Sequence, residues 1–132
     1  MPYTPSDGGH RPPYVPDFRL VFGANQIDYD QNKEAVNRKK HGYSLESAVY
    51  LLERWLLPTP PDPFITSDPI REGGEIRHQH MGIDDAGNVV FMVTTMRADE
   101  TVRVISFRRA SNEEREVFLS LTDYIMPKQR TP

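Results

Sequence analysis

The chain has 132 residues, and its 16 lysines and arginines against 19 aspartates and glutamates leave a net charge of −3. It contains no cysteine, which excludes a disulfide framework and a cysteine-ligated zinc site and leads us to expect a cytoplasmic protein. The acidic balance excludes nucleic-acid binding through the charge of the whole chain, so such a role needs a local basic patch.

Residues 1–25 are rich in proline, glycine, serine and aspartate and show no apolar period. This composition predicts a poorly ordered N-terminal extension. We expect no secretory signal, because an apolar core is missing, and no membrane partner, because the apolar runs are short. The length predicts one folded domain, over residues 26–126, followed by a tail over residues 127–132.

Two helices are predicted after a short strand that begins at Ile27. Asp30 and Gly42 have the residue types of an N-cap and a C-cap for the first helix. Ser44 is the expected N-cap of the second helix. Apolar residues follow Ser44 at helical spacing: Leu45, Ala48, Val49, Leu52 and Leu56. The proline-rich residues 58–74 predict a long loop.

Three strands are predicted in the second half, within EIRHQHMGI, NVVFMVTTMR and TVRVISFRR. Ser111 and Glu114 then match a capping box that opens a final helix. An apolar stripe is expected along that helix: Val117, Phe118, Leu121, Tyr124 and Ile125. This order of elements predicts an α+β fold, with helices stacked on one face of an antiparallel sheet and the other face free for a ligand.

The predicted strands carry many arginines: Arg77, Arg97, Arg103, Arg108 and Arg109. A guanidinium group on a sheet needs an anion, and its planar fork suits a phosphate. The alternative is that these arginines form ordinary ion pairs with Glu75, Glu113, Glu114 or Asp99. The sequence leaves both interpretations open.

His78 and His80 have the spacing that can place two imidazoles on one side of a metal. A third ligand would have to be His41, His10 or a carboxylate, and no pattern fixes one. The alternative is a pair of surface histidines on either side of Gln79. No phosphate-binding or nucleophile motif of known spacing is present, and we expect neither a metal nor another cofactor.

Three blocks of sequence carry a resemblance to a known family: YDQNKEAVNRKKHGYSLESA, GEIRHQHMG and TTMRADETVRVISFRRASNEEREVF. In this order they resemble the BrnT toxins of bacterial type II toxin–antitoxin systems. The resemblance implies a RelE-like fold, an antiparallel sheet packed by two N-terminal helices and a C-terminal helix, and ribonuclease activity without a metal. It also implies a BrnA-like antitoxin of the ribbon-helix-helix type, which blocks the toxin and binds operator DNA.

RNA cleavage without a metal needs a proton acceptor, a proton donor and positive charge at the phosphate. We expect Arg77, Arg97 and Arg108 to stabilise the phosphate and His41 or Glu75 to act as the acid or base. The residues expected to bind flanking RNA are Lys33, Lys40, Arg103 and Arg109. The alternative function is a catalytically inactive module of the same fold that docks an antitoxin or another partner.

Lys33, Asn37, Lys40 and His41 share one face of the first predicted helix. Two roles are open for this polar stripe. It either fixes the joint between the two helices against the sheet or contacts RNA.

Overall fold

The computed structural model describes residues 27–57, 59–96 and 101–127. The predicted N-terminal extension and most of the predicted tail therefore lie outside the described residues, and the domain boundaries stay predictions. The elements are β1 (Ile27–Tyr29), α1 (Gln31–His41), α2 (Leu45–Trp55), β2 (Ile65–Thr66), β3 (Ile70–Glu72), β4 (Glu75–Ile83), β5 (Val89–Met96), β6 (Val102–Arg109) and α3 (Asn112–Leu121). The described helices include none that is long and apolar enough to cross a membrane.

The strands form one mixed sheet in the order β1-β6-β5-β4-β2, with β3 also paired to β4. The expectation of an antiparallel sheet is wrong at one edge, because β1 runs parallel to β6. Parallel neighbours need a long crossover. Here all the elements from α1 to β5 lie between the two strands in the sequence and supply it. The α+β class is confirmed.

The predicted loop over residues 58–74 contains β2 and β3, and both pair with the free edge of β4. These strands have only two and three residues and lie among prolines. They are too short to show the alternation of apolar and polar residues by which a strand is recognised in a sequence. The Gly–Gly pair is the one sequence signal for this hairpin. Gly73 and Gly74 have φ values of 60° and 80°, the geometry of a two-residue turn that joins two antiparallel strands.

The main core lies between α2 and one face of the sheet. Five buried residues of α2 pack against β5 and β6: Leu45, Ala48, Leu51, Leu52 and Trp55. The sequence missed Leu51 and Trp55, whereas Val49 and Leu56 are only partly buried. The Trp55 ring lies so close to Gly82 that a Cβ at this glycine would be 2.4 Å from Trp55 Cζ2, so only glycine fits there.

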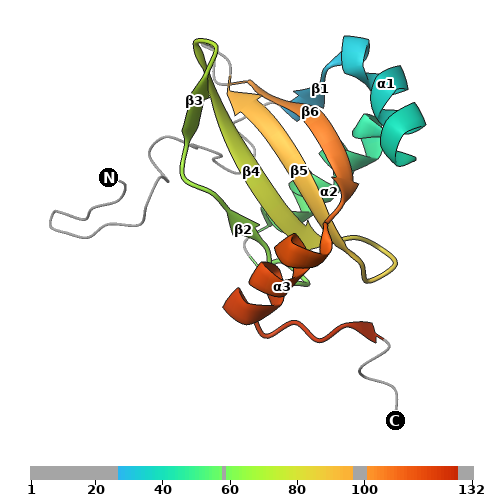
Figure 1. Cartoon of the computed structure of the whole chain (residues 1–132), viewed down its shortest axis with the longest axis vertical. Helices are drawn as coiled ribbons and strands as arrows, with labels where there is room; N and C mark the ends of the chain where they lie inside the picture. Colours follow the sequence, from blue (N-terminus) through green and yellow to red (C-terminus); the bar gives the residue numbers. More distant parts are fainter. Residues whose placement is uncertain (1–26, 58, 97–100, 128–132) are drawn as a thin grey trace, which may run out of the picture.

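The final helix covers the opposite face of the sheet. Phe118 of α3 packs against Ile83 and Val89, and Val89 points away from its neighbour Val90 in the main core. Figure 1 shows α2 behind the sheet and α3 in front of its lower end. The expectation that all helices stack on one face is therefore wrong.

The final helix is also shorter than its apolar stripe predicted. It ends at Leu121, because Thr122 has an extended backbone with φ −133° and ψ 175°. Beyond it, the Tyr124 hydroxyl donates a hydrogen bond of 2.8 Å to the Gly87 carbonyl. Of the predicted stripe, Phe118 and Tyr124 are buried, and the other three residues are exposed.

Beyond the end of β1, the Asn37 side chain forms hydrogen bonds with the backbone at the outer edge of β6. The buried Asn37 amide accepts a hydrogen bond from Phe107 N–H (3.1 Å) and donates one to the Phe107 carbonyl (2.8 Å). The same amide nitrogen lies 2.9 Å from the Tyr43 carbonyl, to which it donates. One carboxamide thus takes the place of a neighbouring strand and holds α1 and the following joint against β6.

The joint between α1 and α2 has the predicted caps. Asp30, Gly42 and Ser44 occupy the capping positions, and Gly42 has a left-handed φ of 76°. Glu34 adds a bond that the sequence did not indicate, because its carboxylate accepts the Leu45 N–H at 2.7 Å. Burial raises the pKa of Glu34, but the hydrogen bonds from Leu45 and Arg38 outweigh it, so the pKa lies below its ordinary value.

Replacing Asn37 by alanine should lower the free energy of unfolding by about 2–4 kcal/mol, because it leaves buried backbone groups of Phe107 and Tyr43 without partners. Urea denaturation measures the change. Asn32 lies on the same helix and is exposed, so Asn32→Ala is the matched control and should stay within about 0.5 kcal/mol of the parent. Equal stability of the two variants would contradict this role of Asn37.

Candidate active site

Two of the described strands, β4 and β6, carry arginines on one face of the sheet, the face opposite α2. Directly paired residues share a face, so the strand register defines three rows. The rows are Arg77–Thr95–Arg103, Gln79–Val93–Ser106 and Met81–Phe91–Arg108. We call this surface the arginine face. It looks toward the reader in Figure 1, and among the described elements no helix covers its upper part.

Arg77 lies between two carboxylates at the upper end of the arginine face. Its Nε and Nη2 atoms are both 3.3 Å from Glu75 Oε1, and its Nη1 atom is 3.5 Å from Glu72 Oε1. The two carboxylates are 39% and 64% exposed. Long contacts to exposed carboxylates contribute little stability, so an incoming phosphate can replace them at low cost.

Arg103 lies on the same row as Arg77, with β5 between them. Two strand spacings separate the two backbones, or about 10 Å. The Arg103 Nε atom is 3.2 Å from Asp28 Oδ1 on β1. Among the described carboxylates, Asp28 is its one ion-pair partner, and this bond uses only one edge of the guanidinium.

Arg108 is held much more firmly than Arg77. Its Nη1 and Nη2 atoms form a two-pronged ion pair with Glu114, at 2.8 and 2.9 Å, and its guanidinium carbon lies 4.3 Å from the centre of the Phe91 ring. The hydrogen bond from Arg108 lowers the pKa of Glu114. The capping box expected at α3 is present, so this carboxylate also accepts the Ser111 N–H. Arg108 is therefore fixed in one orientation.

His41 is the half-buried last residue of α1, one turn beyond Asn37. Burial lowers its pKa, and the positive charges of Lys40 and Arg108 lower it further. The imidazole is therefore neutral at pH 7 and able to accept a proton. The bonds from Asn37 to Phe107 bring this end of α1 beside the part of β6 that carries Arg108.

The predicted site residues form two groups. Arg77, Glu75 and Arg103 lie at one end of the arginine face, and Arg108 lies at the other. His41 lies on α1, close enough to Arg108 for its charge to lower the pKa of the imidazole. Four residues of strand separate the two rows, or about 13 Å. Arg97 lies outside the described residues.

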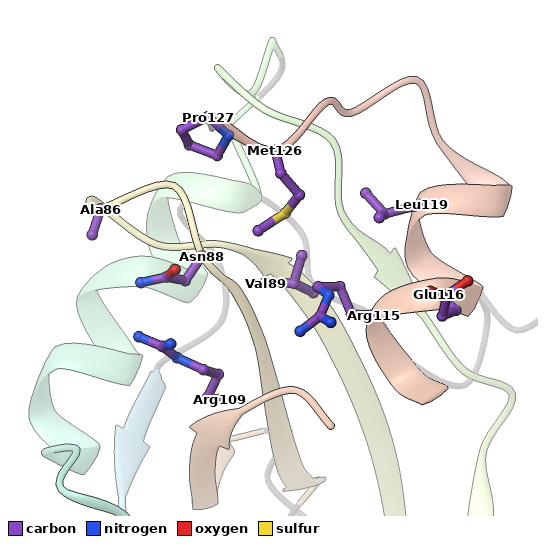
Figure 2. A pocket seen from close by; sticks show the side chains of 9 residues that line it. All are labelled: Ala86, Asn88, Val89, Arg109, Arg115, Glu116, Leu119, Met126 and Pro127. Atoms are coloured by element: carbon purple, nitrogen blue, oxygen red, sulfur yellow. The ribbon is translucent and has the colours of Figure 1, made fainter. Parts of the chain in front are cut away.

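The remaining predicted RNA-binding residues lie elsewhere. Lys33 and Lys40 are exposed on α1. Arg109 alternates away from Arg108 and lines a separate pocket beside the β4–β5 turn (Figure 2).

The ion-pair interpretation of the arginines is correct for Arg77 with Glu75 and for Arg108 with Glu114. Sequence reading missed the other neighbours, Glu72, Asp28 and Phe91. Phe91 and Arg108 are 17 positions apart and meet only through strand pairing. The Gly–Gly turn was the one local signal that could have placed Glu72 opposite Glu75.

His78 and His80 are both fully buried on the α2 face of the sheet, so the interpretation as surface histidines is wrong. The His80 ring bonds to the hydroxyls of Thr66 (3.0 Å) and Thr94 (2.9 Å). No group of three potential metal ligands exists in the described ranges. These two histidines belong to the core.

The fold and the arginine face define the class of protein: a small α+β protein with a surface suited to bind phosphate groups. A comparison with protein families matches residues 29–114 to the family described as "Ribonuclease toxin, BrnT, of type II toxin-antitoxin system". The chain belongs to this family. The resemblance read from the three sequence blocks is therefore confirmed, and the protein is a ribonuclease toxin. A comparison with curated proteins found no match.

Acid should destabilise the protein through His80. Burial, and then the charge of His78, lower its pKa from 6.5 to about 3. Below pH 6.5 the unfolded chain therefore binds a proton that the folded chain does not. Stability should fall by up to about 1.4 kcal/mol per pH unit in this window. Urea denaturation between pH 7.5 and 5 measures the slope, and His80→Gln should reduce it. An unchanged slope in the variant would show that His80 does not titrate in this way.

Proposed function

We propose that this toxin cleaves RNA without a metal, by attack of a ribose 2′-hydroxyl on the adjacent phosphate. The observation that carries the proposal is the arginine face, where Arg77, Arg103 and Arg108 share one surface of the sheet. Fixed positive charge at a phosphate that gains negative charge is usually the largest single contribution to such catalysis. Arg97 is also proposed to contribute, although it lies outside the described residues.

The proposed reaction moves two protons. A base removes the proton of the 2′-hydroxyl, whose oxygen then forms a bond to phosphorus. The bond from phosphorus to the 5′-oxygen breaks, and an acid protonates that oxygen. The products are a 2′,3′-cyclic phosphate and a 5′-hydroxyl.

We assign the base to His41, because its lowered pKa leaves a neutral imidazole at pH 7 and because it lies beside the strand end that carries Arg108. Glu75 is the second candidate, since it contacts Arg77 directly at 3.3 Å. The rows of Arg77 and Arg108 are about 13 Å apart, or about four strand residues, and suit two phosphates of one RNA strand lying along the sheet. The phosphate that is cut lies at the Arg108 row if His41 is the base and at the Arg77 row if Glu75 is the base.

The flanking contacts are proposed to come from Arg103, Arg109, Lys33 and Lys40. Each neutralised phosphate releases counterions, so the affinity for RNA should fall with salt. Arg103 suits this role best of the four, because it lies on the arginine face in the same row as Arg77.

A type II toxin implies an antitoxin partner as well as an RNA substrate. We propose that the partner is BrnA-like, of the ribbon-helix-helix type, and that the toxin meets operator DNA only through it. We also propose a cytoplasmic place of action, where RNA and the antitoxin are made. A RelE-like fold stays a prediction.

One observation favours the second candidate function, a catalytically inactive binding module. Arg77, Arg103 and Arg108 each have a carboxylate partner already. If RNA cannot displace these carboxylates, the same face would serve only to dock an antitoxin or another acidic partner.

Purified toxin, freed of antitoxin, should cut RNA in the presence of EDTA and leave 2′,3′-cyclic phosphate ends. Arg77→Ala should lower the rate about 10²-fold, the effect of removing one fixed charge from a phosphate site. Arg71→Ala is the control, because Arg71 is exposed on the neighbouring strand β3. Gel analysis of end-labelled RNA and mass spectrometry of the ends provide the measurements.

RNA that stays intact under these conditions would favour the binding module. Cleavage only after a metal is added would exclude the proposed mechanism. An Arg77→Ala variant as active as the Arg71→Ala control would remove Arg77 from the site.

The pH dependence of kcat/KM separates the two candidate bases. If His41 is the base, activity rises with pH through a pKa below 6.5, and His41→Gln loses this limb together with about 10²-fold or more of the rate. If Glu75 is the base instead, Glu75→Gln loses about 10²-fold or more of the rate and His41→Gln does not. An identical profile in wild type and His41→Gln would exclude His41.

A further inference from the structure

A pocket of about 440 Å³ lies at the end of the sheet, between the β4–β5 turn, the last residue of β6 and α3 (Figure 2). Such a volume is in the range of small-molecule sites, roughly 300–1,000 Å³. Its lining residues are Ala86, Asn88, Val89, Arg109, Arg115, Glu116, Leu119, Met126 and Pro127.

Two arginines on the wall of this pocket differ from those of the arginine face. In the part of the chain that the structure describes, neither Arg109 nor Arg115 forms an ion pair. The Arg115 guanidinium donates a hydrogen bond of 2.9 Å to the neutral Asn112 side chain. Two cations that line one cavity without a carboxylate partner repel each other, and an anion between them would relieve this repulsion.

The rest of the lining is suited to a flat apolar group. Val89, Leu119, Met126 and Pro127 provide an apolar wall, and the Asn88 amide can both donate and accept hydrogen bonds. Glu116 is the one carboxylate in the lining and opposes an anion. Figure 2 shows Glu116 on α3 at the far side of the pocket from Asn88 and Arg109.

We propose that this pocket binds a nucleotide of the RNA strand, with its phosphate at Arg109 and Arg115 and its base against the apolar wall. The inference rests on the proposed ribonuclease function and adds a subsite to it. The pocket adjoins the lower end of the arginine face, because its lining residue Val89 lies on the same face of β5 as Phe91, whose ring contacts Arg108. An RNA strand that passes Arg108 can therefore enter the pocket around the start of α3.

Isothermal titration calorimetry of the full-length protein tests the pocket without any cleavage. A 5′-nucleoside monophosphate should bind more tightly than inorganic phosphate or the uncharged nucleoside, because only the nucleotide uses both parts of the lining. Arg109→Ala and Arg115→Ala should each weaken its binding at least about tenfold, the loss of a hydrogen bond to a charged group. Arg71→Ala is the matched control and should leave the affinity unchanged.

A second titration uses an oligonucleotide with 2′-deoxyribose at every position, which cannot be cleaved by the proposed mechanism. Arg109→Ala and Arg115→Ala should weaken its binding at least about tenfold as well. No nucleotide binding, or binding that both variants retain, overturns the pocket even if the protein cuts RNA. Nucleotide binding without any effect of the variants on the oligonucleotide overturns its role as an RNA subsite. If the protein does not cut RNA, the first titration still tests whether the pocket binds a nucleotide, because that measurement needs no cleavage.

Discussion

The side chain of Asn37 is the constraint on which the arrangement of this protein depends. β6 needs a neighbour on its outer edge, and β1 reaches only the part of it from Val102 to Val104. Beyond that, the Asn37 amide bonds both backbone groups of Phe107, which leaves no buried peptide group of this residue without a partner. The same amide bonds Tyr43 and so fixes the joint between the first two helices. The Asn37 carboxamide therefore holds both α1 and the joint that leads to α2 against β6.

The main core and the arginine face lie on opposite faces of the sheet. The face of the sheet toward α2 holds the main core, including the buried His78 and His80, and it contributes most of the apolar burial. The opposite face carries the arginines, each of which keeps a carboxylate partner. These partners reduce the repulsion among like charges. They differ in strength: Arg108 is held from both sides by Glu114 and Phe91, whereas the bonds of Arg77 are long and open to solvent. The firm pair orients its guanidinium, and the loose pair can yield to a phosphate.

Much of this could be predicted from the sequence, and the failures have physical causes. Caps are local, so Asp30, Gly42, Ser44 and Ser111 were correctly identified. The three long strands follow from their own patterns. The parallel pairing of β1 depends on contacts 75 residues apart, which no local pattern records. The predicted apolar stripe was wrong at Ile125, because the extended backbone of Thr122 ends the helix before the pattern does. Val117 and Leu121 lie within the helix but are exposed. The arginines were recognised as a group, but their partners Asp28 and Phe91 come from other strands.

The central claim is that the arginine face receives the phosphates of RNA. The most direct measurement is an NMR spectrum of the arginine Nε–H groups, recorded while an all-2′-deoxy oligonucleotide is added. The account predicts that the Arg77 and Arg103 signals shift as their bonds to Glu75 and Asp28 are exchanged for phosphate. The Arg71 signal should stay in place, because Arg71 pairs in register with Ile76 and therefore lies on the opposite face of the sheet from Arg77. Unchanged Arg77 and Arg103 signals at saturating oligonucleotide would contradict the account.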